Sequence, residues 1–210
     1  MINLYRSVIF FCATIALTAQ HSVASEDDAI VQYSERAVEL LRDAISRETV
    51  KGQGLVPAYA ESLEQVFLEA GFPPAALSIV PYGETASLVV RYEGDGSSGR
   101  KPILFSSHMD VVPADPNSWL RHPFEFQEDE TFYYGRGVLD NKFDVTMLTT
   151  LFVWLKESGF VPNRDLVIAF TGDEETAQET VQQLAGDFRH LVDAELSLIH
   201  ISEPTRPPEI

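Results

Sequence analysis

Residues 166–178 read LVIAFTGDEETAQ, and this short segment decides the fold. Its first five residues are all apolar and lead to Thr171, a composition typical of a buried strand. Gly172 then leads directly into three consecutive carboxylates, Asp173, Glu174 and Glu175. Three neighbouring carboxylates repel one another, and the end of a buried strand is a poor place to solvate them. Something must therefore compensate their charge.

Strands and helices alternate on the N-terminal side of this segment. Short β-prone runs bounded by turn residues predict strands over 86–92, 103–107 and 131–134, with a polar, glycine-rich hairpin or loop over 93–101. Apolar residues at helical spacing predict helices over 30–45, 57–71 and 140–158, and a fourth follows the segment over about 176–191. Alternating elements with buried strands are typical of an α/β domain.

The first 24 residues have the layout of a secretory signal peptide. Arg6 precedes an apolar run over 8–19, and the small-residue stretch Ser22-Val23-Ala24 follows it, so cleavage is expected after Ala24. A membrane anchor is the alternative, but the run is shorter than the roughly 20 residues that a spanning helix needs. We therefore expect an exported protein, periplasmic or extracellular, with no stable membrane anchor after cleavage.

The net charge restricts which partners the protein can bind, and the cysteine content restricts which side chains can bind a metal. The formal net charge of −17 argues against nucleic acid and against anionic membrane surfaces as partners. The only cysteine, Cys12, lies within the predicted signal peptide, so a mature chain has no thiol nucleophile and no cysteine ligand. Any catalytic metal would have to be held by His, Asp and Glu side chains.

The first motif that could hold a metal is SSHMD, residues 106–110, at the end of a predicted strand. His108 and Asp110 lie two residues apart, so their side chains point the same way in an extended chain. Asp110 could then hydrogen-bond to the imidazole and fix which ring nitrogen is free, as carboxylates do for metal-ligating histidines. Taken alone, a His-x-Asp pair is common, and a purely structural role is the more frequent one.

Two further motifs also follow predicted strands. In YGRGVLDNK, residues 134–142, glycines flank a turn that places Asp140 at the start of a helix, where an ordinary N-cap is the alternative role. In GDEE, residues 172–175, adjacent carboxylates on a turn point in different directions, so one can bind a metal while the other faces a reacting water. Glu175 alone could equally belong to an acidic loop or to the first turn of the next helix.

The conjunction of the three motifs is more specific than any one of them. Each follows a predicted strand of one α/β sheet, and in such sheets the functional crevice lies at the carboxyl ends of the strands. The sequence therefore predicts divalent cations bound by His108, Asp140 and Glu175, and these cations would compensate the carboxylate charge.

With these motifs the sequence resembles the zinc metallopeptidases that include glutamate carboxypeptidase, aminoacylase, succinyl-diaminopimelate desuccinylase and carnosinase-type dipeptidases. The matching segments are SSHMDVVPADPNSW, YYGRGVLDNK and LVIAFTGDEET, and the resemblance extends from the first helix to about Glu195. It implies a three-layer α/β catalytic domain with a mostly parallel mixed sheet over residues 25–196. It also implies hydrolysis of a small peptide or an N-acyl amino acid.

The same resemblance assigns roles to individual residues. His108 would bind one metal ion, Asp140 would bridge two, and Glu175 would bind the second. Glu174 would be the general base, and Asp110 would support the histidine. The expected cofactors are two divalent ions, Zn²⁺ by expectation, with Co²⁺ or Mn²⁺ as alternatives.

The chain departs from the family towards its C-terminus. The resemblance implies a further carboxylate ligand, a distal histidine and a small dimerisation (lid) domain that we do not find, so the catalytic domain is expected to be truncated. Residues 197–210 are expected to be an aberrant tail that packs poorly, although His200 and Glu203 fall near the position expected for the carboxylate. The full-length form could be a homodimer. The alternative is an inactive fragment or a non-catalytic homologue that binds metal weakly.

Overall fold

The computed structural model describes residues 26–199 of the chain. Its helices and strands, in chain order, are α1 (Glu26–Ser46), α2 (Val56–Glu69), β1 (Leu77–Tyr82), β2 (Thr85–Tyr92), β3 (Ile103–His108), β4 (Gln127–Glu128), β5 (Tyr133–Tyr134), α3 (Lys142–Glu157), β6 (Leu166–Thr171), α4 (Glu179–Ala185), α5 (Arg189–Val192) and β7 (Leu196–Ile199). Single 3₁₀ turns lie at Pro74–Ala76 and Pro116–Ser118.

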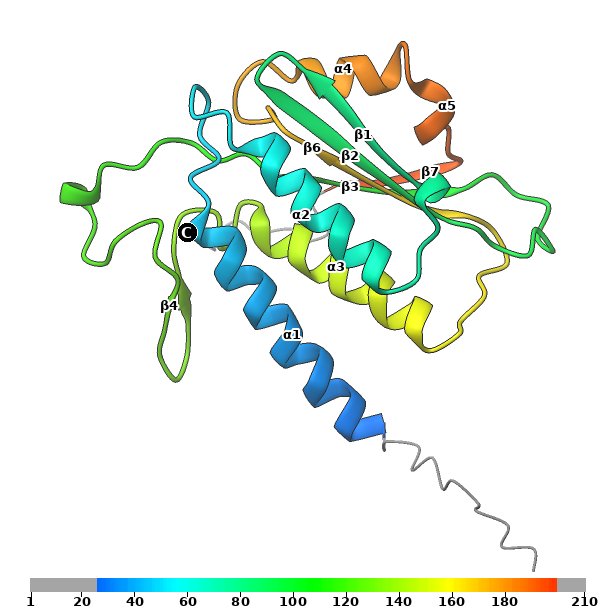
Figure 1. Cartoon of the computed structure of the whole chain (residues 1–210), viewed down its shortest axis with the longest axis horizontal. Helices are drawn as coiled ribbons and strands as arrows, with labels where there is room; N and C mark the ends of the chain where they lie inside the picture. The colour runs from blue at the N-terminus through cyan, green and yellow to red at the C-terminus, as the bar shows by residue number, and fades with distance from the viewer. Residues whose placement is uncertain (1–25, 200–210) are drawn as a thin grey trace, which may run out of the picture.

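A mixed five-stranded sheet forms the middle layer, in the order β1-β2-β6-β3-β7. Helices α1, α2 and α3 lie on one side of the sheet, and α4 and α5 lie on the other (Figure 1). Strands β4 and β5 form a separate two-stranded hairpin away from the main sheet. This is the α/β architecture that the sequence predicts.

The strand that decides the fold, β6, lies at the centre of the sheet. It pairs antiparallel with β2 and parallel with β3, with His108 opposite Thr171. The parallel ladder continues past both strands, because Met109 N–H donates to the carbonyl of Thr171 at 2.8 Å. The two carboxyl ends therefore leave the sheet side by side.

The main core lies between the sheet and the helices α2 and α3. Phe152 of α3 is fully buried there, and its ring meets Phe105 of β3 edge-on at 5.8 Å and Tyr92 of β2 at 6.2 Å. A smaller apolar cluster on the opposite face joins Val89 and Val167 to Leu184 of α4. Because both faces are covered, β6 can be apolar along its whole length, as its sequence indicates.

One sequence expectation about the elements was wrong, and one strand was missed. The helix expected over 176–191 is two short helices, α4 and α5, because the chain breaks at Gly186, which has φ −97° and ψ −95°. Of the two forms expected for residues 93–101, a hairpin or a loop, the structure has the loop, because β6 lies between β2 and β3. Strand β1 was missed; it contains Pro81, which an edge strand tolerates since one of its sides carries no ladder partner.

The structure does not test most of the predicted domain boundaries. The signal peptide over 1–24 lies outside the described residues. The tail was expected to begin at Ser197, but Ser197–Ile199 belongs to β7, where Ser197 pairs with Leu104 and Ile199 pairs with Ser106. All four residues of β7 are exposed, and residues 200–210 lie outside the described part.

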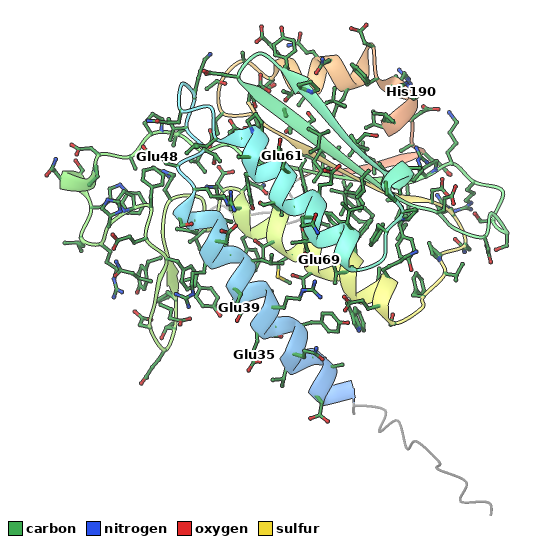
Figure 2. The ribbon with its side chains drawn as sticks, in the orientation of Figure 1. Glu35, Glu39, Glu48, Glu61, Glu69 and His190 are labelled. Carbon is green, nitrogen blue, oxygen red and sulfur yellow. The ribbon has the colours of Figure 1, made fainter. Side chains whose placement is uncertain are left out.

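Several acidic side chains lie on the outer surfaces of α1 and α2. Glu35 and Glu39 project from α1, and Glu61 and Glu69 from α2 (Figure 2). Within residues 26–199, no helix is both long enough and apolar enough to cross a membrane.

Replacing Phe152 by Ala should lower the free energy of unfolding by about 3–5 kcal/mol, because it leaves a cavity at the centre of the main core. Phe132, whose side chain is 62% exposed, provides the matched control, and Phe132→Ala should cost less than about 0.5 kcal/mol. Urea denaturation of both variants would measure the difference. Equal losses of stability would contradict this description of the core.

Candidate metal centre

The three predicted metal ligands converge at the carboxyl edge of the sheet. His108 is the last residue of β3, Asp140 lies two residues before α3, and Glu175 lies in the loop after β6. One ligand atom from each residue lies within 4.8 Å of the other two, and His108 Nε2 is 2.9 Å from Asp140 Oδ1. The parallel pairing of β3 with β6 accounts for this convergence, because it places two of the three ligands at adjacent strand ends.

His108 is buried, and contacts of its Nδ1 with Asp110 fix the orientation of its ring. Its Nδ1 lies 3.0 Å from the main-chain carbonyl oxygen of Asp110 and 3.4 Å from that residue's Oδ1, which leaves Nε2 facing Asp140. Burial by itself lowers the pKa of His108. The hydrogen bonds and the negative charge of Asp110, together with the hydrogen bond to Asp140, outweigh burial and raise that pKa to about 9.

The carboxylate of Asp110 has a second role that sequence reasoning missed. Its Oδ1 accepts a hydrogen bond from the amide of Glu174 at 3.1 Å, and its Oδ2 accepts one from the amide of Glu175 at 3.0 Å. Asp110 was expected to support the histidine, and it contacts the imidazole as expected. In addition it ties the backbone of the two glutamates to β3.

The two glutamates face the centre differently. Glu175 joins the converging group, and burial followed by the charge of Asp140 raises the pKa of its carboxyl group. Glu174 Oε2 lies 3.9 Å from His108 Nε2, too far for a hydrogen bond, and its Oε1 accepts one from Gln178 Nε2 at 3.3 Å. Glu174 therefore borders the converging group without belonging to it.

The turn that carries Asp140 is anchored on both sides by residues that had no assigned chemistry. Lys142 is fully buried, and its Nζ donates to the main-chain carbonyls of Ala44, at 2.7 Å, and Arg47, at 2.5 Å, where α1 ends. Burial, followed by the charge of Arg47, lowers the pKa of Lys142 to about 7. Asn141 is also buried, and its Oδ1 accepts a hydrogen bond from Ser107 Oγ of β3.

Gly137 completes this turn, with φ +89°, a conformation that side chains with a Cβ rarely adopt. A Cβ there would lie 2.9 Å from Val111 Cγ1 and 3.0 Å from Lys142 Cδ. The glycine flanking Asp140 thus serves close packing as well as the turn.

Two other histidines do not contribute to the centre. His122 lies in the loop between β3 and β4, and His190 lies on the exposed helix α5 (Figure 2). Both residues are exposed.

The donors present fit a divalent transition metal. One imidazole nitrogen and two carboxylate oxygens are the donor types that zinc takes when cysteine is absent. The side chain of Asp140 is 62% exposed, which leaves its second oxygen accessible from solvent. Among the described residues, His108, Asp140 and Glu175 are the one group with this geometry.

Comparison with known proteins agrees with the arrangement of the site. The model of peptidase family M20/M25/M40 matches residues 104–210, just over half of the chain. An N-fatty-acyl-amino acid synthase/hydrolase of Danio rerio is 39% identical over 79 residues, which cover 37% of this chain and 15% of that protein. A succinyl-diaminopimelate desuccinylase of Ruegeria pomeroyi is 32% identical over 146 residues, which cover 69% of this chain and 37% of that protein.

A solved structure shows the same fold. An M20 family metallo-carboxypeptidase of Sulfolobus solfataricus superposes with a TM-score of 0.64 at 19% identity, covering 78% of this chain and 37% of that chain. The chain thus spans well under half the length of these three similar proteins. The matched segment, residues 104–210, includes all three converging residues, His108, Asp140 and Glu175. On the fold, the site and the matched segment together, the chain belongs to peptidase family M20/M25/M40.

Proposed function

We propose that this chain contributes the metal centre of a hydrolase that cleaves a peptide or N-acyl amide bond. The observation that supports the proposal is the convergence of His108, Asp140 and Glu175, with the carboxylate of Glu174 at its border, 3.9 Å from His108 Nε2. Metal ligands and an adjacent carboxylate are what metal-assisted hydrolysis of an amide needs.

His108, Asp140 and Glu175 would hold the metal, with Asp140 shared between two ions, and zinc suits the donors. When bound, such ions lower the pKa of a water molecule and polarise the scissile carbonyl. Glu174 is placed to accept a proton from a water molecule at the site and to pass it to the leaving amine. Asp110 keeps His108 and the amides of both glutamates in register.

The proposed substrate class follows the names of the relatives. One is an N-fatty-acyl-amino acid synthase/hydrolase and another a succinyl-diaminopimelate desuccinylase, both acting on N-acylated amino acids by name, while a structural neighbour is a carboxypeptidase. A small peptide or an N-acyl amino acid is therefore the proposed substrate. Dimerisation of a full-length form stays an expectation from the resemblance.

In an active form of the protein, Glu174→Gln should reduce kcat by about 10²–10⁴-fold and leave the zinc content unchanged, because it removes the proton acceptor and no metal ligand. Glu61→Gln, an exposed position on α2 (Figure 2), is the matched control and should change neither. Turnover of N-acyl amino acids and dipeptides, with zinc content by mass spectrometry, provides both readouts.

For the 210 residues alone we expect weak zinc binding and negligible turnover, because two ions would share only three protein donors among the described residues. Zinc-dependent turnover by this chain that Glu174→Gln left unchanged would contradict the proposed role of Glu174. Turnover that the substitution abolished would contradict only the expectation for the short chain.

Zinc affinity should rise with pH up to about pH 9 and level off above it. His108 has a pKa of about 9 in the metal-free protein, and only its neutral imidazole can bind a metal, so below that pH a proton competes with zinc. One competing proton corresponds to about a tenfold gain in affinity per pH unit. Isothermal titration calorimetry in two buffers of different ionisation enthalpy would also detect the released proton.

His190→Ala is the control for this measurement, since His190 is exposed on α5, and it should leave the pH profile unchanged. His108→Ala should abolish binding. A zinc affinity that did not vary between pH 7 and pH 9 would exclude His108 as a ligand that binds with loss of a proton.

We also propose that the protein is exported and that signal peptidase cuts after Ala24, on the pattern of small residues at Ser22 and Ala24. Ala24→Arg should prevent processing, whereas Val23→Ile, at the tolerant middle position, should not. N-terminal sequencing of the exported protein would give the site. A mature protein that still began at Met1 would refute the prediction.

A further inference from the structure

Asp173, the first of the three consecutive carboxylates, lies apart from the metal centre. Its side chain is buried, and its two oxygens accept hydrogen bonds from the amides of Glu179, at 2.7 Å, and Thr180, at 3.1 Å. The hydroxyl of Thr180 donates to the same carboxylate. The first amides of α4 and one hydroxyl therefore stabilise the charge of Asp173, with no need for a cation.

The main chain of Asp173 closes the same loop from inside. Its carbonyl oxygen accepts hydrogen bonds from the amides of Thr176, at 3.2 Å, and Gln178, at 3.0 Å. Together with the side-chain bonds, these contacts join residue 173 to residues 176–180. Glu174 and Glu175 lie within this closed segment, which we call the base loop (residues 173–180).

The base loop is also fixed to the sheet. Thr180 Oγ1 accepts a hydrogen bond from the amide of Gly172 at 3.3 Å, and Thr85 Oγ1 of β2 donates to the carbonyl of Gly172 at 2.7 Å. A Cβ on Gly172 would lie 2.3 Å from Thr85 Oγ1 and 2.4 Å from the carbonyl oxygen of Ala86, so only glycine fits. The start of the base loop therefore cannot shift along β6.

Gln178 has an uncommon backbone conformation within the base loop. Its φ of +55° is left-handed, which is uncommon for a residue other than glycine and persists only where surrounding contacts impose it. In this conformation Gln178 Nε2 reaches the main-chain oxygen and Oε1 of Glu174, both at 3.3 Å. The closed loop thus returns a hydrogen-bond donor to the proposed general base.

We infer that Asp173 is a positioning residue, which closes the base loop through Thr180 and so sets the directions in which Glu174 and Glu175 point. The inference rests on the proposed function for the roles of the two glutamates. Its physical basis is that Asp110 holds the glutamate amides from β3 while Asp173 holds the other end of the loop on α4. A displacement of about 1 Å at such a site is enough to impair catalysis.

Asp173→Asn tests the inference. The side-chain amide keeps the shape of the carboxylate, but its NH₂ group is a donor and cannot accept a hydrogen bond from the backbone amide of Glu179 or Thr180. Asp165 provides a matched control at the opposite end of β6, where its carboxylate accepts hydrogen bonds from Arg91 Nη1, at 2.8 Å, and the amide of Gly94, at 3.0 Å. Asp165→Asn makes the same chemical change in an anchored loop that is remote from the metal centre.

Hydrogen exchange of the metal-free 210-residue chain is the first readout. Exchange at the amides of Glu174 and Glu175 should increase at least about tenfold in Asp173→Asn and stay within about twofold in Asp165→Asn, although both variants lose stability. Thr180→Val should behave like Asp173→Asn, and Thr180→Ser, which keeps the hydroxyl, should not. Unchanged protection of both glutamate amides in Asp173→Asn and Thr180→Val would overturn the inference.

Zinc affinity is the second readout and should fall at least about tenfold in Asp173→Asn while Asp165→Asn leaves it unchanged. Equal affinities in the two variants would overturn the positioning role even if the loop became mobile. If the unaltered chain bound no zinc, the proposed metal centre would fail, and the exchange measurement would still decide whether Asp173 holds the loop. If Asp173→Asn did not fold, the comparison of Thr180→Val with Thr180→Ser would decide it.

Discussion

The metal centre depends on the parallel pairing of β3 with β6. This ladder places His108 opposite Thr171 and lets both strands end at the same edge of the sheet, so Asp110 and Glu174, 64 positions apart in the chain, become neighbours. Parallel strands need coverage on both faces, and α3 on one side and α4 on the other provide it. Both the apolar sequence of β6 and the acidic residues that follow it are therefore explained by the position of this strand. It is buried at the centre of the sheet, and its carboxyl end leads into the loop that carries the glutamates.

The carboxylates at this edge of the sheet fall into two groups. Asp110 and Asp173 are buried, and each receives hydrogen bonds from backbone amides, so neither needs a cation. Asp140 and Glu175 converge on His108 instead, and their mutual repulsion contributes to the raised pKa of Glu175. Two anchored carboxylates thus hold the backbone, and the others remain free for ligation and proton transfer. This division is a reason why five acidic residues can lie close together in a folded chain, namely Asp110, Asp140, Asp173, Glu174 and Glu175.

The sequence was sufficient for the fold class and for the converging residues, because both follow from local pattern: an apolar run that ends in Gly-Asp-Glu-Glu, and motifs that follow strands. It was not sufficient for the contacts that hold them. No local signal indicates that the carboxylate of Asp110 reaches the amides of Glu174 and Glu175, or that Lys142 reaches the end of α1, since these contacts depend on tertiary structure. The helix break at Gly186 was missed because glycine permits several backbone conformations and packing selects one. Strand β1 was missed because Pro81 has no N–H to donate, which argues against a strand except at the edge of a sheet.

The buried side chain of Lys142 has a consequence for the time course of folding. It joins the turn of Asp140 to the carbonyl of Ala44, a residue 98 positions earlier, at the end of the first helix of the described chain. Contacts of such sequence separation require closure of a long loop, and chains rich in them fold slowly. The turn of Asp140 can reach its final geometry only after α1 has docked. The contact between His108 and Asp140 joins residues that are 32 positions apart in the chain. The three ligands reach their final geometry only when this long-range contact has formed, and zinc binding would report that it has.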